Sequence, residues 1–164
     1  MTRMMRPLGA DHNSTSHAAI LSVSPNEEDH GFLGRLFDGS DWYVPGKSEC
    51  AFIRSSTLAS ACSVLRERPA RVVLCERDLF PGTWRDMWEH ISLLPDPPLL
   101  IVTSRLADDR LWLEALNLGA YDVLAKPFHA GEVIRVVTFA WQDWQNRRDV
   151  RAGRTNPRLA ATGT

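Results

Sequence analysis

The sequence has few cysteines and lacks any long apolar run. Its three cysteines, Cys50, Cys62 and Cys75, are odd in number and show no C-x-x-C spacing, which argues against a disulfide framework and against a structural metal site. No apolar stretch approaches the roughly 20 residues that a membrane-spanning helix needs. Residues 1–17 also lack the apolar centre of a secretory signal. These absences predict a cytoplasmic protein with reduced thiols and no contact with a membrane.

The chain also lacks a large net charge of either sign. The 19 lysines and arginines and the 20 acidic residues leave a formal charge of −1, so the chain as a whole has no attraction for nucleic acid or membrane surfaces. A short basic run near the C-terminus has no interleaved aromatic side chains, which is more typical of a solvated end than of a nucleic-acid contact. Its arginines are Arg147, Arg148, Arg151, Arg154 and Arg158.

The composition is that of one globular domain. The 164 residues are 44% hydrophobic and 24% charged, which is enough for a core of ordinary size. Residues 1–17 and 148–164 are polar and carry no apolar stripe, so we expect a flexible N-terminal arm and a flexible basic C-terminal tail around a domain at residues 18–147. Neither arm could bury a second core, which predicts a stand-alone domain.

Short apolar runs alternate with amphipathic segments between residues 18 and 147. Five strands alternating with five helices predict a doubly wound α/β fold, in which helices cover both faces of a parallel sheet. Residues 24–27 indicate a capping box with proline at the first helical position. The second strand is either residues 42–44 or residues 51–53. The other strands fall near residues 18–23, 70–75, 99–104 and 121–125, and the later helices near residues 57–68, 83–94, 108–118 and 129–147.

Two of these strands end in side chains that suit an anion. Thr103 and Ser104 close the fourth apolar run, and Lys126 and Pro127 follow the fifth. Because the carboxyl ends of parallel strands meet at the same edge of a sheet, we expect a hydroxyl and an ammonium group to lie together there. Such a pair can hold an anionic group.

The same strand ends give the chain a family resemblance. Thr103, the Gly-Ala-Tyr-Asp turn at residues 119–122 and the sequence Lys126–Pro127–Phe128 resemble the receiver domain of bacterial two-component response regulators, the CheY-like family. The resemblance covers roughly residues 18–147. It implies a flavodoxin-like sheet with strand order 2-1-3-4-5 and a cis peptide bond between Lys126 and Pro127.

The resemblance also implies a phosphorylation pocket, from which this chain departs. Receivers use an aspartate at the end of the third strand as phosphoryl acceptor, and two acids after the first strand help it to hold Mg²⁺. Here Ser24, Pro25 and Asn26 follow the first strand, and a hydroxyl and a proline ring cannot anchor Mg²⁺. Glu76 stands at the acceptor position. The resemblance is therefore to an atypical or pseudo-receiver without a metal.

The acidic residues near this pocket have several interpretations. Glu76 is one methylene longer than aspartate, so its carboxylate could form an ion pair with Lys126 and partly mimic the phosphorylated state; alternatively, it ends a strand and points to water. Asp78 is the fallback acceptor if the strand continues. The acids of the first helical turn suit the helix dipole and cap rather than the pocket. They are Glu27, Glu28 and Asp29.

The resemblance implies a signalling protein that binds other proteins and is not an enzyme. We expect it to bind a histidine kinase or a downstream effector in a two-component pathway, without a cofactor and without Mg²⁺-dependent phosphorylation. The alternative is a working phosphoacceptor that takes phosphate from a histidine kinase and needs Mg²⁺. A flavodoxin-like cofactor binder shares the fold, but residues 24–26 do not form a glycine-rich loop for phosphates.

Aromatic side chains in the last two helices suggest an interaction surface. Trp112 lies off the apolar stripe of its helix, and Trp141 and Trp144 lie near the end of the last helix. Together with Val123, which stands where receivers carry a switch aromatic, they mark a face for a partner or a homodimer; alternatively, the tryptophans pack at the rim of the core. The dispersed histidines are expected at the surface or at helix caps: His12, His17, His30, His90 and His129.

Overall fold

The computed structural model describes residues 18–38, 42–44 and 50–153. The strands are β1 (Ala18–Val23), β2 (Cys50–Ser55), β3 (Ala70–Glu76), β4 (Leu99–Ser104) and β5 (Asp122–Ala125). The helices are α1 (Glu27–Phe37), α2 (Leu58–Glu67), α3 (Trp84–Ser92), α4 (Asp109–Leu118) and α5 (Ala130–Arg151). All paired strands are parallel, and their order is β2-β1-β3-β4-β5. The predicted doubly wound α/β fold with the order 2-1-3-4-5 is therefore confirmed.

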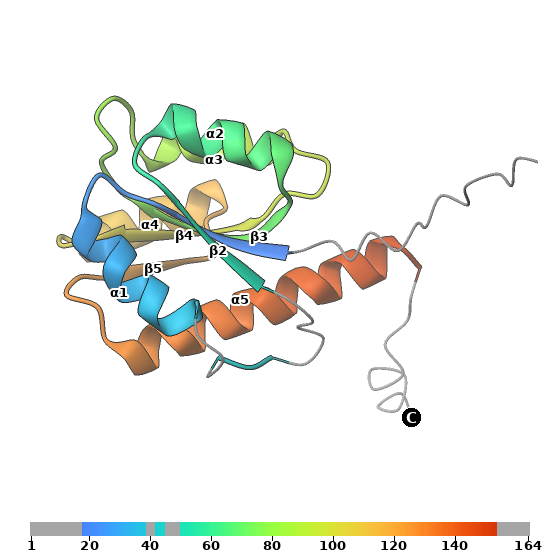
Figure 1. The fold of residues 1–164 in the computed structure, drawn as a ribbon. Coiled ribbons are helices and arrows are strands. Elements are labelled where there is room, and N and C mark those ends of the chain that lie inside the picture. The colour runs from blue at the N-terminus through green and yellow to red at the C-terminus, as the bar shows by residue number, and fades with distance from the viewer. Residues whose placement is uncertain (1–17, 39–41, 45–49, 154–164) are drawn as a thin grey trace, which may run out of the picture.

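Helices cover both faces of this sheet (Figure 1). Residues of α1 and α5 pack on one face, and residues of α2, α3 and α4 pack on the other. The central strands β1, β3 and β4 are buried almost throughout, as expected where both faces of a parallel sheet are covered. On the α1–α5 face, the rings of Phe37 and Trp42 lie 5.1 Å apart and those of Trp42 and Trp141 lie 5.3 Å apart, both edge to face.

Most helix ends follow local sequence signals. Thr57, Thr83 and Asp108 cap α2, α3 and α4 with their side-chain oxygens, as residues of these types do. Gly119 ends α4 with a φ of 111°, and a Cβ at this position would lie 2.7 Å from the ring of Trp88. Both the backbone conformation and the close approach of Trp88 therefore require glycine there.

The start of α1 differs from the expectation. Asn26 is the N-cap, its side chain makes no capping bond to the helix, and Pro25 lies before the first helical residue. The Ser24 hydroxyl accepts a hydrogen bond from the Asn26 backbone N–H at 3.1 Å and donates one to the Asp29 carboxylate at 2.7 Å. The predicted capping box is wrong because Ser24 bonds to Asp29 instead of to the first helical turn's backbone.

Residues 51–53, not residues 42–44, form the second strand. They lie in β2, which pairs with β1 from Ala18 opposite Cys50 onward. Residues 42–44 have no strand structure, yet Trp42 and Val44 are buried. Their apolar character reflects packing on the aromatic cluster of the α1–α5 face, which explains why both segments resembled strands.

The last helix extends beyond the predicted domain boundary at residue 147. α5 continues through Arg148 to Arg151, so the prediction of a flexible tail is wrong for these residues. The guanidinium carbon of Arg148 lies 5.5 Å from the ring centroid of Trp144, and this stacking gives the extra turn a contact with the core. The predictions for residues 1–17 and 154–164 lie outside the described residues.

Three of the four predicted interface residues belong to the core. Trp141 and Trp144 expose only 1% and 8% of their surface, and Val123 exposes 4%. Because α5 lies along the sheet (Figure 1), Trp141 and Trp144 continue the inner stripe of Val137. The prediction that these residues form a surface is wrong. Trp112, by contrast, exposes 43%.

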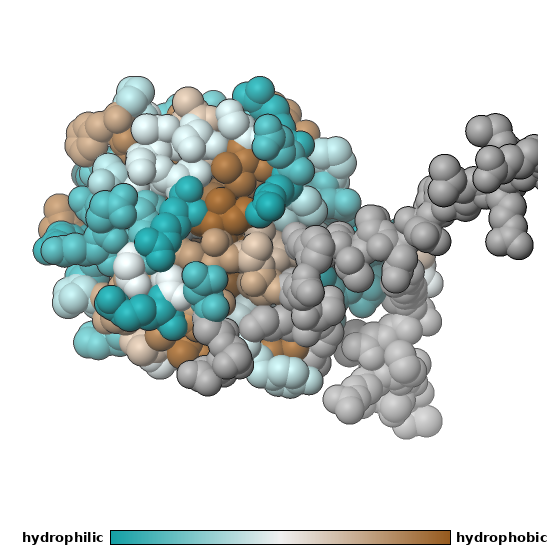
Figure 2. All heavy atoms as spheres, viewed as in Figure 1, coloured by the Kyte–Doolittle hydropathy of each residue, from teal (hydrophilic) through white to brown (hydrophobic). Residues whose placement is uncertain are grey.

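The surface is mostly hydrophilic on the face that Figure 2 shows, with hydrophobic side chains in separate patches. Within the described part of the chain, no helix has both the length and the apolar character to cross a membrane. Cys75 is fully buried in the core, and burial raises the pKa of its thiol.

Candidate functional site

The candidate site lies at the carboxyl ends of β1, β3, β4 and β5. Glu76 is the last residue of β3 and is paired with Thr103 of β4. The loop after β3 is tied to the same strand, because the Arg77 backbone N–H donates to the Thr103 carbonyl at 2.9 Å. Lys126 follows β5 directly, and its backbone N–H donates to the Ser104 carbonyl at 2.9 Å. The sheet itself thus brings the predicted carboxylate, hydroxyl and ammonium groups together.

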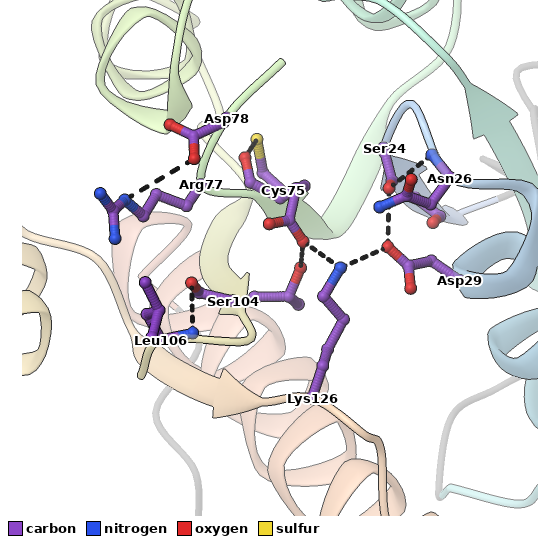
Figure 3. A network of polar contacts seen from close by, with 12 residues as sticks. Ser24, Asn26, Asp29, Cys75, Arg77, Asp78, Ser104, Leu106 and Lys126 are labelled. Atoms are coloured by element: carbon purple, nitrogen blue, oxygen red, sulfur yellow. Dashed lines mark hydrogen bonds and ion pairs between the residues drawn. The ribbon is translucent and has the colours of Figure 1, made fainter. Parts of the chain in front are cut away.

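The Lys126 ammonium lies between two carboxylates. Its Nζ is 2.5 Å from Glu76 Oε2 and 2.8 Å from Asp29 Oδ2. Figure 3 shows the lysine side chain reaching from β5 toward Asp29 on α1. The side chains of Lys126, Asp29 and Glu76 expose only 5%, 11% and 12% of their surface. The alternative in which Glu76 points to water is therefore wrong, and the ion pair is buried rather than exposed.

Each carboxylate also accepts a hydrogen bond from one hydroxyl. Thr103 Oγ1 donates to Glu76 Oε2 at 3.2 Å, and Ser24 Oγ donates to Asp29 Oδ2 at 2.7 Å. The two acids therefore share one cation and have one hydroxyl each. With both carboxylates ionised, the group of five side chains has a net charge of −1, compensated by the hydroxyl dipoles rather than by a second cation.

Burial has the largest influence on Glu76 and raises the pKa of its carboxyl above the ordinary value. The Lys126 ammonium acts in the opposite direction, as does the Thr103 hydroxyl more weakly, while the negative charge of Asp29 adds to the effect of burial. The upward direction means that the desolvation of Glu76 outweighs its attraction to Lys126, as is common for buried ion pairs.

A buried histidine supports the loop that carries Ser24. His30 Nε2 lies 2.8 Å from the Ser24 carbonyl oxygen, and its Nδ1 lies 2.9 Å from Ser22 Oγ. A neutral imidazole satisfies both contacts, with Nε2–H donating to the carbonyl and Nδ1 accepting from the hydroxyl. Because His30 exposes only 1% of its surface, the expectation of a surface or cap histidine is wrong for it.

Ser104 and Asp78, which are also predicted at the site, lie near the network but make contacts outside it. Ser104 Oγ accepts from the backbone N–H of Leu106 at 3.0 Å and so shapes the loop after β4. Asp78 lies beyond the end of β3, half exposed and 3.9 Å from Arg77; Figure 3 shows this pair apart from Lys126. The peptide bond between Lys126 and Pro127 is cis, as expected.

The structure adds Asp29 to the site, a residue that had been assigned to the helix cap and dipole. Its carboxylate bonds to Lys126 and Ser24, so the prediction that the first-turn acids stay outside the pocket is wrong for Asp29. The sequence did contain a signal. Asp29 lies four residues before Leu33 and therefore on the buried stripe of α1.

The donors present do not fit the Mg²⁺ site of a receiver. Both pocket carboxylates contact the Lys126 ammonium, and the loop at residues 24–26, directly after β1, contributes the Ser24 hydroxyl but no acid. Across the described ranges, no group of three or more His, Cys, Asp or Glu side chains is placed to hold a metal ion. Mg²⁺ prefers octahedral oxygen ligands that include carboxylates, and an ammonium group occupies the position between the two available here.

The family resemblance also implies a relay in which the hydroxyl at the end of β4, here Thr103, acts on a switch aromatic in β5, and this chain departs from it. Val123, at the position of the switch aromatic, is buried on the α2–α4 face of the sheet. Tyr121 is tied elsewhere, because its hydroxyl donates to Asp143 Oδ2 of α5 at 2.7 Å. Burial is the main cause that raises the pKa of Tyr121 to about 12, and the hydrogen bond to Asp143 adds to it. Thr103 therefore bonds to Glu76, and neither Val123 nor Tyr121 serves as its switch aromatic.

An open groove lies beside the network, between α1 and the loop that follows β5. Two aromatic side chains line it, Phe32 and Phe128, whose ring centroids lie 5.5 Å apart. Arg35 and Arg105 line it together with Asp29 and Lys126. A partner that occupied this groove would contact the buried network directly.

Comparison with solved structures places the fold among receiver domains. NtrX from Brucella abortus matches with a TM-score of 0.70 and 20% identity over 84% of this chain, which spans only 29% of that chain. The signal receiver domain of a putative LuxO repressor protein from Vibrio parahaemolyticus matches with a TM-score of 0.69 and 16% identity, covering 82% of this chain and 97% of that one.

A third neighbour is the signal receiver domain of an HD domain-containing protein from Pseudomonas fluorescens Pf-5, with a TM-score of 0.66 and 21% identity over 82% of this chain and 94% of that one. No family model matches the chain, and no curated protein does. At these identities the likeness is one of fold, and function has to be argued from the site.

Proposed function

We propose that this chain is a receiver-like signalling domain that works by binding other proteins, without Mg²⁺-dependent phosphorylation. The observation that carries the proposal is the Lys126 ammonium held between Glu76 and Asp29. In this proposal the protein is not an enzyme and uses no cofactor. It acts in the cytoplasm, within a two-component pathway.

The physical argument concerns the charge at the acceptor. Transfer of a phosphoryl group to a carboxylate brings negative oxygens together, and cations must neutralise that charge. The single ammonium here is already shared by two carboxylates, and Ser24 stands where an acid would help to hold a metal. Glu76 also reaches Lys126 and Thr103 at once, which are the contacts expected of a phosphorylated acceptor. We therefore propose that the pocket keeps these contacts at all times and has no separate phosphorylated state.

Two surfaces are available for partners, which we propose to be a histidine kinase or a downstream effector. One is the groove beside Lys126, lined by Phe32, Arg35 and Phe128. The other is the outer side of α4, where Trp112, Leu113 and Leu116 expose 43%, 64% and 37% of their surface. An apolar helix face of this kind suits a protein partner or a homodimer.

Incubation with acetyl phosphate and Mg²⁺, followed by mass spectrometry of the intact protein, tests this proposal. We expect no change in mass under conditions that phosphorylate a receiver domain with the ordinary acidic residues, used as the positive control. A stable adduct of one phosphate on Glu76 or Asp78 would contradict the proposal.

The alternative function is a working phosphoacceptor that takes phosphate from a histidine kinase. It is favoured by Thr103 and Lys126, which converge on Glu76 at the ends of β4 and β5. This function requires Mg²⁺, so binding of Mg²⁺ at the site separates the two. A calorimetric titration that shows Mg²⁺ binding in the wild type, and its loss in Glu76→Gln, would favour the phosphoacceptor.

A further inference from the structure

The end of the sheet opposite the candidate site has an irregular register at Arg71. Ala19 of β1 is paired with Ala70 of β3, but the next residue, Ile20, is paired with Val72. Arg71 is the extra residue, as in a β-bulge, a feature that re-aims side chains. Arg71 contacts the α5 tryptophans, and Val72 packs in the same α1–α5 core. The bulge therefore turns two successive side chains toward α5.

The Arg71 side chain is buried between two aromatic rings. It exposes only 8% of its surface. Its guanidinium carbon lies 4.4 Å from the ring centroid of Trp141 and 4.9 Å from that of Trp144. Ring faces attract the positive charge, but they provide no acceptor in the plane of the guanidinium, and its Nε–H is left without one.

Two buried donors in this region lack hydrogen-bond partners. Among the described residues, neither Arg71 Nε nor Trp141 Nε1 has a hydrogen-bond acceptor. By contrast, Trp144 Nε1 donates to the Pro97 carbonyl at 3.2 Å. Buried polar groups are nearly always hydrogen-bonded, so two orphan donors on side chains that stack on one another are both open to an acceptor.

The surrounding charges favour an acceptor that is negative. Arg148 stacks on Trp144 with its guanidinium carbon 5.5 Å from the ring centroid. Burial is the main influence that lowers the pKa of Arg71, and the positive charge of Arg148 adds to it, whereas Asp149 and Cys50 act in the opposite direction. Asp96, an acid on the loop before β4, lies 3.9 Å from Arg151 and so has a cationic partner there.

We propose that Arg71, Trp141 and Arg148 form a binding site for an oxyanion, a carboxylate or a phosphate, at the amino end of the sheet. The fork of guanidinium N–H groups matches the oxygen pairs of both anions. The indole N–H of Trp141 supplies a further donor, and the indole rings exclude water, which strengthens the attraction. This site is distinct from the Glu76–Lys126 network and does not depend on phosphorylation there.

The test uses the indole N–H signals of the six tryptophans in the NMR spectrum of the full chain. Inorganic phosphate and acetate are titrated separately, with chloride holding the ionic strength constant. We expect the signal of Trp141 to shift saturably while those of Trp84 and Trp112 stay unchanged. Saturation with phosphate alone, acetate alone or both supports the site and identifies the anion. No saturable shift with either anion overturns it.

Variants separate a built site from general attraction to a basic helix end. Arg71→Met and Arg148→Met should each weaken binding by about tenfold or more, since each removes a charge-assisted contact, whereas Arg151→Met and Arg110→Met should leave it nearly unchanged. Equal weakening by Arg151→Met would overturn the proposal in favour of diffuse electrostatics. Arg148 is exposed, so its variant should remain folded even if Arg71→Met does not, and circular dichroism checks both.

Discussion

The two ends of the sheet each bury a cation, and they surround it differently. At the carboxyl ends, Lys126 lies between two carboxylates. At the amino ends, Arg71 lies between two indole rings. Carboxylates provide both opposite charge and hydrogen-bond acceptors, whereas ring faces provide attraction without in-plane acceptors. The first cation is therefore held by the protein's own carboxylates, and the second keeps an unsatisfied Nε–H donor.

Removal of the first cation should have the largest effect on stability. Lys126→Met leaves two buried carboxylates without a counter-charge, and breaking a buried pair in this way costs about 3–5 kcal/mol. Urea unfolding at neutral pH measures the loss. Because the stranded carboxylates bind protons more readily in the folded state, part of the stability should return as the pH falls. An unchanged midpoint would mean that Lys126 is not the counter-charge of this pair.

Removal of the second cation should cost less. Arg71→Met keeps the apolar stem between the indoles and loses a desolvated cation–π contact, which predicts a loss of about 1–2 kcal/mol. The exposed arginine at position 110 provides the matched control, and Arg110→Met should stay within about 0.5 kcal/mol of wild type. A loss as large as that of Lys126→Met would contradict the contrast between the two ends.

Removing one carboxylate should lower the free energy of unfolding by less than removing either cation. Glu76→Gln should change the free energy of unfolding by no more than about 1 kcal/mol, because the relief of desolvation offsets the lost attraction and Asp29 still pairs with Lys126. Asp78→Asn changes a half-exposed acid next to the site and should be neutral. A large loss for Glu76→Gln would show that attraction, not desolvation, dominates at Glu76.

The pH dependence of Glu76 has a definite sign. Its pKa is raised in the folded state, chiefly by burial, so between the unfolded and folded pKa values the folded state binds more protons. Stability therefore falls as the pH rises through that window, just above the ordinary carboxyl range. Relative to Glu76→Gln, the wild type should gain stability as the pH is lowered from neutral toward the ordinary carboxyl range. A loss of stability on lowering the pH, relative to Glu76→Gln, would show that attraction to Lys126 outweighs the desolvation of Glu76.

The smallest change in stability is expected on the surface of α4. Trp112→Ala removes a half-exposed side chain and should alter the unfolding midpoint little. If α4 forms a homodimer interface, the same variant should lower the molar mass measured by light scattering at high concentration. His129→Ala, at the cap of α5, serves as the control. An identical mass for wild type and Trp112→Ala would remove α4 from the proposed interface.

Much of the fold could be predicted because its signals are local. The apolar runs, the caps Thr57 and Thr83, and the residues at strand ends each follow from a short stretch of sequence. Topology then brings Glu76, Thr103 and Lys126 together, since parallel strands end at one edge. The contact of Glu76 with Lys126 could be anticipated for this reason.

The environments of Asp29, Arg71 and the α5 tryptophans depend on tertiary packing, which no short stretch of sequence shows. Asp29 was assigned to the helix dipole, although its position on the buried stripe carries it into the pocket. The sequence prediction places Trp141 and Trp144 at a surface, but they lie four and seven residues after Val137 and so share the face of α5 that packs on the sheet. Arg71 gave no signal, since a bulge breaks the alternation on which strand patterns rest.

A crystal structure of the chain soaked in Mg²⁺ and beryllofluoride measures the central claim directly. The account predicts that Lys126 Nζ stays within hydrogen-bond distance of both Glu76 and Asp29, with neither Mg²⁺ nor beryllofluoride bound at the strand ends. Clear density for both ions next to Glu76, with the lysine turned away from Asp29, would contradict it.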